Sequence, residues 1–366
     1  MNKVDPLPLS GDAMHRTPSS VGEGPPRQKR ALPGPGDWIL STLSTLVLAF
    51  VLWRVLSWAV VNGVFGTTPQ SCSDATGACW SVIRARWRII LFGLYPMEEQ
   101  WRSAIASVIA VCTLALACMP RMWSAARMVP VWLGGYLLFL LFIHGGVFGL
   151  DVVTSSRWGG LTLTLLIYIT VIAFGLPVAI GLALLRQSRY PVFRHLTAFI
   201  VDVTRSLPLL TILFSATVII PLMLPHVLQG DKLVRSLVGF TFFFACYQSE
   251  IVRGGLQAVG RGQVEASQAL GMSYWHTTSL ITLPQAFRIA MPATINQFVI
   301  TFKETSLVII VGLFDLMASA QAAYHSGEWS AYHTEVYVFV ALIYFIGSFS
   351  LSKYGKYVEK RFQTLR

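Results

Sequence analysis

The chain has 366 residues, of which 54% are hydrophobic and 12% charged, and its formal net charge is +11. The charged share is about half that of a typical soluble domain, which excludes an ordinary soluble globular protein. The composition predicts an all-α polytopic membrane protein, with room for roughly eight helices of about 20 residues. The positive charge could indicate a nucleic-acid binder, so the positions of the basic residues must decide what it means.

Apolar runs alternate with polar connections from residue 38 onward. Residues 1–37 are rich in Pro, Gly and Ser and lack apolar periodicity, which predicts a disordered tail. The run 38–61 is too long for a signal-peptide core and begins too far into the chain, so we expect a retained span. A composition change near Arg157 separates a three-span extension, 38–157, from a five-span domain, 158–366. The other expected spans are 105–119, 129–150, 159–185, 196–222, 233–252, 289–313 and 336–351.

The basic residues gather on one side of the predicted membrane. The N-terminal tail, the loops 120–128, 186–195 and 253–288, and the C-terminal tail together hold 18 of the 28 Lys and Arg residues. The connections on the opposite side hold five. Because cytoplasmic connections carry an excess of Lys and Arg, both termini and the 253–288 loop are predicted to be cytoplasmic. The positive charge therefore indicates membrane topology, and we expect no nucleic-acid partner.

The long outward connection, 62–100, contains Cys72 and Cys79. The two can form a disulfide in an oxidising compartment, but the sequence does not supply the geometry, so the pairing stays open. The alternating Arg84, Arg86 and Arg88 are interpreted as a solvated interfacial face.

We expect a kink in the predicted span 196–222, since Pro208 removes a backbone donor and clashes with the preceding turn. Asp202 and Arg205 stand just before Ser206, Leu207 and Pro208. A kink there would leave backbone groups able to face a cavity. The alternative is structural: Arg205 can simply pair with Asp202.

The connection 263–296 is the most polar long segment of the second half. Val264 to Leu270 are good helix formers with Glu265 in the first turn, and Gly271 provides a stop. A second short helix is expected over 273–282, ending before Pro284, which can start a helix but not continue one. The expected product is a helix, a bend and a helix outside the membrane.

The spacing of this connection resembles the EAA loop of ATP-binding-cassette importer permeases. The matching residues are Glu265, Ala266, Gly271, Ile281, Leu283 and Pro284, with Ser267 where the family usually has Ala. The resemblance extends to the polar-amino-acid branch through residues on both sides of the loop: Glu250, Arg253, Gly254, Gly255, Gly262, Gln263, Gln285, Ala286, Arg288, Pro292, Asn296, Lys303, Thr305, Ser306 and Leu307. It covers about 158–363, and the three-span extension looks like the general L-amino-acid permease subgroup.

The resemblance implies a type I importer domain of five helices that moves L-amino acids from periplasm to cytoplasm by alternating access. It implies that a coupling helix docks on an ATPase dimer, which would bind ATP and Mg. It also implies a second, related permease, with a heterodimer favoured and a homodimer open, and a periplasmic amino-acid-binding protein. The predicted outward segments 223–232 and 312–335 are candidate docking surfaces for that protein. The residues implied to couple are Val264, Glu265, Ala266, Ala269, Leu270, Gly271 and Met272.

Two further charges lie within the predicted span 289–313. Burying Lys303 or Glu304 costs at least ~2.5 kcal/mol unless the charge is paired or hydrated. Asn296 and Gln297 fall about two turns earlier, at spacings compatible with one face shared with Glu304. We hypothesise that Glu304 meets the ammonium of an amino acid, and that Arg205 or Lys303 meets its carboxylate.

Other readings of these charges stay open. A structural role is favoured for Lys303, and the family usually has Arg-Gly-Thr-Pro where this chain has Arg205 to Pro208, so no solute contact is carried over from the Gly or the Thr. Glu250 and Arg253 are interpreted as an ion pair that braces the cytoplasmic loop.

Several catalytic patterns are missing from the sequence. It has no G-x-x-x-x-G-K-[ST], no H-E-x-x-H and no G-x-S-x-G, and its seven histidines form no spaced ligand set. We therefore expect no enzyme activity, cofactor or metal in this chain. The alternative function is a secondary transporter or channel for a polar solute that works without an ATPase; a membrane anchor or membrane enzyme is disfavoured by the polar groups within the spans.

Overall fold

The computed structural model describes residues 34–73, 76–225, 229–325 and 327–363. The predicted disordered tail lies outside them except for its last four residues. The chain divides into two compact units, Met1–Ser57 and Trp58–Arg366. The first contains α1, Pro35–Leu56, which begins inside the predicted tail with Pro35 in its first turn, where a missing N–H costs nothing. None of the residues of α1 is buried.

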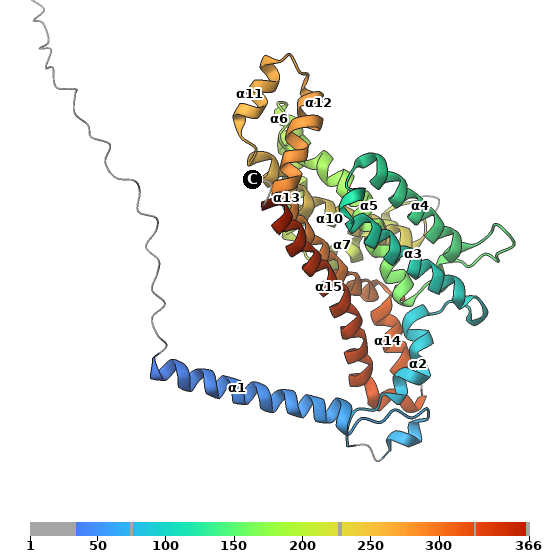
Figure 1. The fold of residues 1–366 in the computed structure, drawn as a ribbon. Helices are drawn as coiled ribbons and strands as arrows, with labels where there is room; N and C mark the ends of the chain where they lie inside the picture. The colour runs from blue at the N-terminus through green and yellow to red at the C-terminus, as the bar shows by residue number, and fades with distance from the viewer. Residues whose placement is uncertain (1–33, 74–75, 226–228, 326, 364–366) are drawn as a thin grey trace, which may run out of the picture. The chain divides into compact units, whose positions relative to one another are not determined.

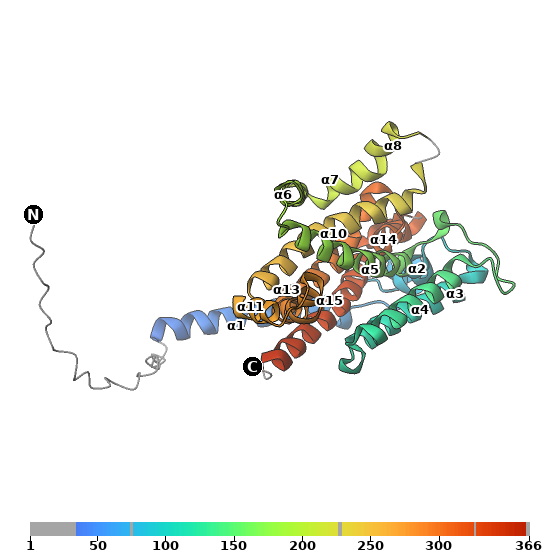
Figure 2. The same ribbon diagram turned by 90° about the horizontal axis from the view of Figure 1, so that it is seen from above.

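The second unit is built from helices, and Figures 1 and 2 show their arrangement. The α-helices are α2 Ser81–Phe92, α3 Gln100–Cys118, α4 Ala125–His144, α5 Gly160–Arg186, α6 Pro191–Ser206, α7 Leu209–Phe214, α8 Ile220–Met223, α10 Lys232–Gln257, α11 Arg261–Ala269, α12 Tyr274–His276, α13 Leu283–Glu304, α14 Leu316–His325 and α15 His333–Gln363. Among the π and 3-10 segments, η6 is Ser215–Ile219, η7 is Thr277–Thr282, η8 is Thr305–Val311 and η9 is Gly327–Tyr332.

Eight segments account for the predicted spans. In the described chain, six helices are long and apolar enough to cross a membrane, and the bent pair formed by α6 and Leu209–Met223 makes a seventh. The eighth is α10, which is 26 residues long but more polar, with a mostly buried face. This arrangement confirms the all-α polytopic prediction of about eight helices.

The core follows from the packing of α5 on α10, α10 on α13 and α13 on α15 (Figures 1 and 2). Tyr168, Phe240, Phe244 and Phe302 are almost fully buried in it. The α3–α4 pair also packs on α5, where Ser103 and Thr162 share a 2.7 Å hydrogen bond. Helices α3 and α4 of the extension therefore share one core with the transport domain, although the sequence changes character at residue 157.

The end of the bundle that carries α2 and α14 is closely packed. The end of α2 touches the start of α5 through Gly93, Gly159 and Gly160. Gly160 has φ +63°, and a Cβ on it would collide with the carbonyl group of Leu91. Only glycine accepts both the left-handed backbone and the close approach.

The outward connection forms a hydrogen bond with α15. Cys72 and Cys79 form a disulfide with their Cα atoms 5.8 Å apart, which settles the pairing that the sequence left open. The backbone N–H of Cys79 donates to Glu335 Oε1 at 2.9 Å. Both cysteines and Glu335 are buried, so this connection is part of the core rather than a loose loop.

The same end holds a fully buried arginine. Arg102 donates to the carbonyls of Phe142 at 3.0 Å and of Asp151 at 2.9 Å, and it pairs with Glu99 at 3.3 Å. Tyr95 donates to Ile143 O at 2.9 Å, and burial raises the pKa of Tyr95 to about 12. Arg102 and Tyr95 thus bind carbonyl groups at the C-terminal end of α4 that the helix itself leaves without donors.

The expected kink in the span 196–222 is confirmed: two segments meet at 107° between Ser206 and Leu209, an angle that the sequence does not specify. One local prediction was wrong. The expected break at Pro284 does not occur, because η7 leads directly into α13. The wider π turn accommodates a proline that would clash in a regular α-helix.

Candidate coupling loop and membrane pathway

The polar connection forms a helix, a bend and a helix, as predicted. Helix α11 ends with the N–H of Gly271 on Gln268 O at 2.9 Å and the N–H of Met272 on Ser267 O at 3.0 Å. This is the Schellman arrangement, and Gly271 supplies the required positive φ, +75°. Ser273 then caps α12, accepting from the backbone N–H of His276. The bend is therefore encoded by Gly271 and Ser273.

Ser267, which stands where the family usually has Ala, forms a hydrogen bond between the two helices of the loop. It is 1% exposed, and its hydroxyl lies 3.0 Å from the Thr277 hydroxyl and donates to Val264 O at 2.7 Å. Ten residues separate the two partners, so local spacing alone does not predict this bond.

The outer side of the loop is uncovered. Leu270 is 80% exposed and Trp275 is 70% exposed. Figure 1 places α11 and α12 at the end of the unit opposite α2 and α14. We call these the α11 end and the α2 end. Large apolar side chains projecting from a polar loop are typical of a surface that binds another protein.

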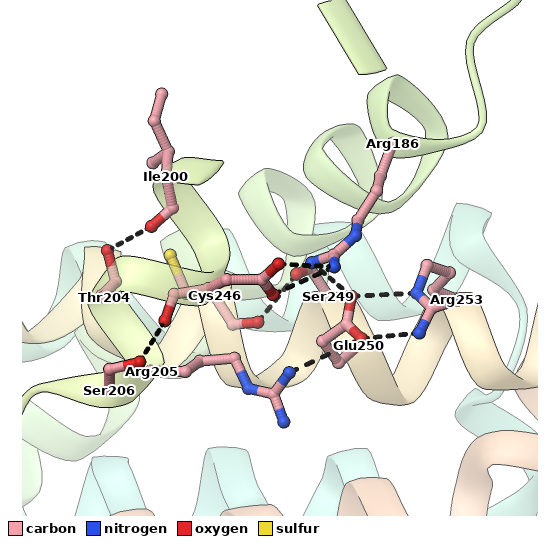
Figure 3. Close-up of polar contacts among 10 residues, drawn as sticks. Arg186, Ile200, Thr204, Arg205, Ser206, Cys246, Ser249, Glu250 and Arg253 are labelled. Atoms are coloured by element: carbon pink, nitrogen blue, oxygen red, sulfur yellow. Dashed lines mark hydrogen bonds and ion pairs between the residues drawn. The ribbon is translucent and has the colours of Figure 1, made fainter. Parts of the chain in front are cut away.

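The Glu250 carboxylate, on α10 before the loop, contacts three arginines (Figure 3). Arg253 binds Glu250 through two nitrogens at 2.9 and 2.7 Å, a bidentate geometry that strengthens the pair. Arg186, at the end of α5, lies 3.0 Å from Glu250, and Arg205, at the end of α6, lies 3.5 Å from it. Arg186 also bonds Asp202 at 2.9 Å. This charge cluster joins α5, α6 and α10.

The cluster corrects the pairing considered for Arg205. Asp202 binds Arg186, whereas Arg205 binds Glu250. The guanidinium carbon of Arg205 also lies over the Tyr247 ring, 5.3 Å from the ring centroid. Tyr247 also donates to the Arg205 carbonyl at 3.0 Å, next to the break in the span. Three arginines against two carboxylates leave the cluster with an excess positive charge, which would suit a carboxylate ligand.

The second pair of expected pathway charges lies where α13 ends. Lys303 is exposed, whereas Glu304 is partly buried and its Oε2 has no hydrogen-bond partner among the described residues. At Thr305 the helix tightens into η8, which packs against α7. The break after α6 and the change of helix type after Glu304 therefore lead into two segments in contact. Irregular helices of this kind line solute sites in transporters.

Not all the expected pathway residues come together. Asn296 is exposed while its neighbour Gln297 is buried, so the two face different surroundings. Within the described chain, no hydrogen bond or ion pair joins Arg205 to Lys303 or Glu304. The sequence did not predict that Glu250 links α10 to α5 through Arg186, because the position of a charge at a helix end does not show which distant residue it contacts.

Comparisons with known proteins identify the family. Residues 172–364 match the family model described as binding-protein-dependent transport system inner membrane component. The chain is 41% identical over 336 residues to the inner membrane amino-acid ABC transporter permease protein YhdY of Escherichia coli strain K12, covering 89% of this chain and 90% of that protein.

Two more relatives show how far the likeness extends. Identity is 32% to the glutamate/glutamine/aspartate/asparagine transport system permease protein BztC of Rhodobacter capsulatus, over 94% of both chains. It is 36% to the glutamate/aspartate import permease protein GltK of Escherichia coli O6:H1, over 55% of this chain and 91% of that protein. YhdY and BztC thus match along the extension as well, whereas GltK is shorter. The chain belongs to the binding-protein-dependent transport system inner membrane component family, as a multi-pass permease subunit of an ATP-driven importer.

Proposed function

We propose that this permease carries L-amino acids into the cytoplasm. The relatives named as amino-acid permeases support this substrate class, and two of them, YhdY and BztC, match this chain along the extension as well. The likeness of the extension to the general L-amino-acid subgroup is part of the proposal. In this proposal both termini and α11 are cytoplasmic, in agreement with the charge count. The alternative of a secondary transporter without an ATPase offers no role for the loop and conflicts with the family.

The uncovered face of α11 and the bend at Gly271 carry the proposal. Val264, Glu265, Ala266, Ala269, Leu270, Gly271 and Met272 would dock on a separate ATPase subunit that binds ATP and Mg. Movement of α11 would pass along the chain to α10, and from α10 to α5 and α6 through the charge cluster at Glu250. It would pass to α13 through the Ser267–Thr277 bond and the unbroken η7–α13 helix.

The amino acid would pass where α7 and η8 meet. Arg205 to Pro208 lead into α7, and Lys303 and Glu304 lead into η8, while Asn296 and Gln297 lie about two turns below them on α13. Glu304 is proposed to meet the ammonium group, because its carboxylate is partly buried and lacks a partner in the described chain. Arg205 is proposed to receive the carboxylate as solute leaves toward the α11 end.

The complete importer would contain a related second permease, two ATPases and a periplasmic amino-acid-binding protein. A heterodimer is the favoured arrangement. The binding protein would dock at the α2 end, where residues 312–335 lie beside the disulfide-closed connection.

Co-purification and crosslinking test the coupling. The chain should co-purify with an ATPase, and a cysteine at Leu270 should crosslink to it. Gly271→Pro fixes φ near −65° and should abolish uptake while the complex still assembles, whereas Gly271→Asn, which tolerates a positive φ, should retain uptake. Uptake by the chain without any ATPase would contradict the coupling.

A competition series tests the solute. Uptake of a labelled amino acid into proteoliposomes should be inhibited by several L-amino acids, and Glu304→Gln should raise KM for all of them. Unaltered uptake of every amino acid by Glu304→Gln would remove that residue from the pathway.

A further inference from the structure

Helix α6 lies crosswise at the α11 end of the bundle and leaves one face uncovered. It meets the α7–α8 segment at 107°. Its buried residues are Thr197, Val201 and Thr204, on the side that contacts α5 and α10. Helix α7 packs against α10, so α6, which turns away from α7 by more than a right angle, lies across the end of the bundle.

The uncovered face of α6 is a continuous apolar stripe. Val192, Leu196, Phe199 and Val203 recur at helical spacing and are 73%, 55%, 67% and 44% exposed. Polar and charged groups, among them Arg194 and His195, lie outside the stripe and are also exposed. An amphipathic helix of this kind, with charged and aromatic residues beside its apolar face, is typical of helices that lie in a membrane interface.

Basic and aromatic residues border the stripe at its N-terminal end. Arg189 and Arg194 are exposed, and neither forms an ion pair with any side chain that the structure describes. Tyr190 is 70% exposed and lies edge-on to Phe193, with ring centroids 6.3 Å apart. Tyrosine is enriched at membrane interfaces because its ring is apolar and its hydroxyl polar.

We propose that α6 is an interfacial helix that inserts the stripe Val192, Leu196, Phe199 and Val203 into the leaflet at the α11 end and binds anionic lipid headgroups through Arg189 and Arg194. The acyl region accepts the stripe, and phosphate groups complement the two guanidinium groups. The proposal depends on the function above only in naming this leaflet cytoplasmic.

A second copy of this surface would be a poorer partner than lipid. A symmetric contact between two α6 helices would bring two sets of Arg189 and Arg194 together without an acidic partner. Lipid surrounds every inner-membrane protein and requires no such match. Protein coverage of the stripe is therefore an outcome that the test must be able to detect.

Site-directed spin labelling separates lipid, water and protein around α6. Single cysteines would replace the four stripe residues in a chain whose Cys112, Cys118 and Cys246 are alanine and whose disulfide is retained. In the assembled complex in nanodiscs, labels on the stripe should be accessible to oxygen and shielded from a water-soluble nickel chelate. A label at His195, which is exposed and lies outside the stripe, should show more nickel access than the stripe labels.

Two results would overturn the insertion. Nickel access along the stripe would place it in water, and protection from both relaxants would place it under protein. Neither reading depends on solute or ATP, so failure here is distinguishable from failure of the proposed transport function.

Lipid preference tests the headgroup contact. A fluorophore on a cysteine at Phe193 should be quenched at least about twofold more by spin-labelled phosphatidylglycerol than by spin-labelled phosphatidylcholine, with the difference shrinking as salt rises. The double variant Arg189→Gln and Arg194→Gln should abolish that difference. Arg84→Gln and Arg88→Gln, on α2, should not. Equal quenching by the two lipids in the parent chain would overturn the headgroup contact.

Discussion

The two ends of the helix bundle are held by different interactions. At the α2 end, a disulfide, the buried Arg102 and the contact between Gly160 and α2 leave little room for change. At the α11 end, ion pairs around Glu250 hold α5, α6 and α10 with side chains that are partly exposed. Ion pairs can exchange partners at small cost, whereas a packed core cannot be deformed gradually. Movement is therefore expected at the α11 end, on a fixed α2 end.

The largest effect should come from Gly160→Val. A β-branched side chain at φ +63° is strained and would collide with Leu91, so we expect destabilisation of at least about 4 kcal/mol. The readout is the apparent melting temperature of the purified complex, or loss of the complex. Gly181→Ala, on the same helix but facing open space, should be neutral or slightly stabilising. Equal stability of Gly160→Val and the parent chain would mean that the α2 end is not rigidly packed.

Arg102→Met should have the next largest effect. It leaves the carbonyls of Phe142 and Asp151 without their donor, which should lower the free energy of unfolding by about 2–4 kcal/mol. Limited proteolysis should then cut the segment between α4 and α5 faster. Arg84→Met, at an exposed site on α2, should stay within about 0.5 kcal/mol of the parent. A similar loss in both variants would show that the buried contacts of Arg102 are not its main contribution.

Glu250→Gln should have a smaller effect on stability and a larger one on coupling. The three arginines then keep only Asp202 as a counter-charge, so we expect a loss of about 1–2 kcal/mol. Solute-stimulated ATP hydrolysis should fall more than basal hydrolysis, and stability should depend less on salt between about 0.05 and 1 M than in the parent. Glu98→Gln, at an exposed site of the α2 end, is the control. Unchanged coupling would mean that the charge cluster does not transmit movement.

Ser267→Ala should have the smallest effect. It restores the residue usual in the family and removes one buried hydrogen bond, which should lower the free energy of unfolding by about 1 kcal/mol. Hydrogen exchange should rise in α11 only, and uptake should be retained. Thr277→Val should produce the same local change, and the double variant should add little more. Fully additive effects would show that the two hydroxyls do not act as a pair.

Local sequence rules were most successful in the polar connection. The stop at Gly271 and the helix before it follow from propensity and backbone preference over a few residues, and both are confirmed. The same reasoning was wrong at Pro284, where a π turn changes the local geometry. It also located the break at Leu207 and Pro208 without its angle, because the direction of α7 depends on packing against α10.

By itself, the sequence determined the membrane class, the approximate spans, the bent polar loop and the permease family. Each of these follows from the hydrophobic length or the motif spacing of a continuous stretch of chain. Only the tertiary structure decided that Cys72 pairs with Cys79, that Arg205 binds Glu250 instead of Asp202, and that α6 turns across the end of the bundle. Those outcomes depend on distances between atoms of segments far apart along the chain, and such distances exist only once the helices have packed.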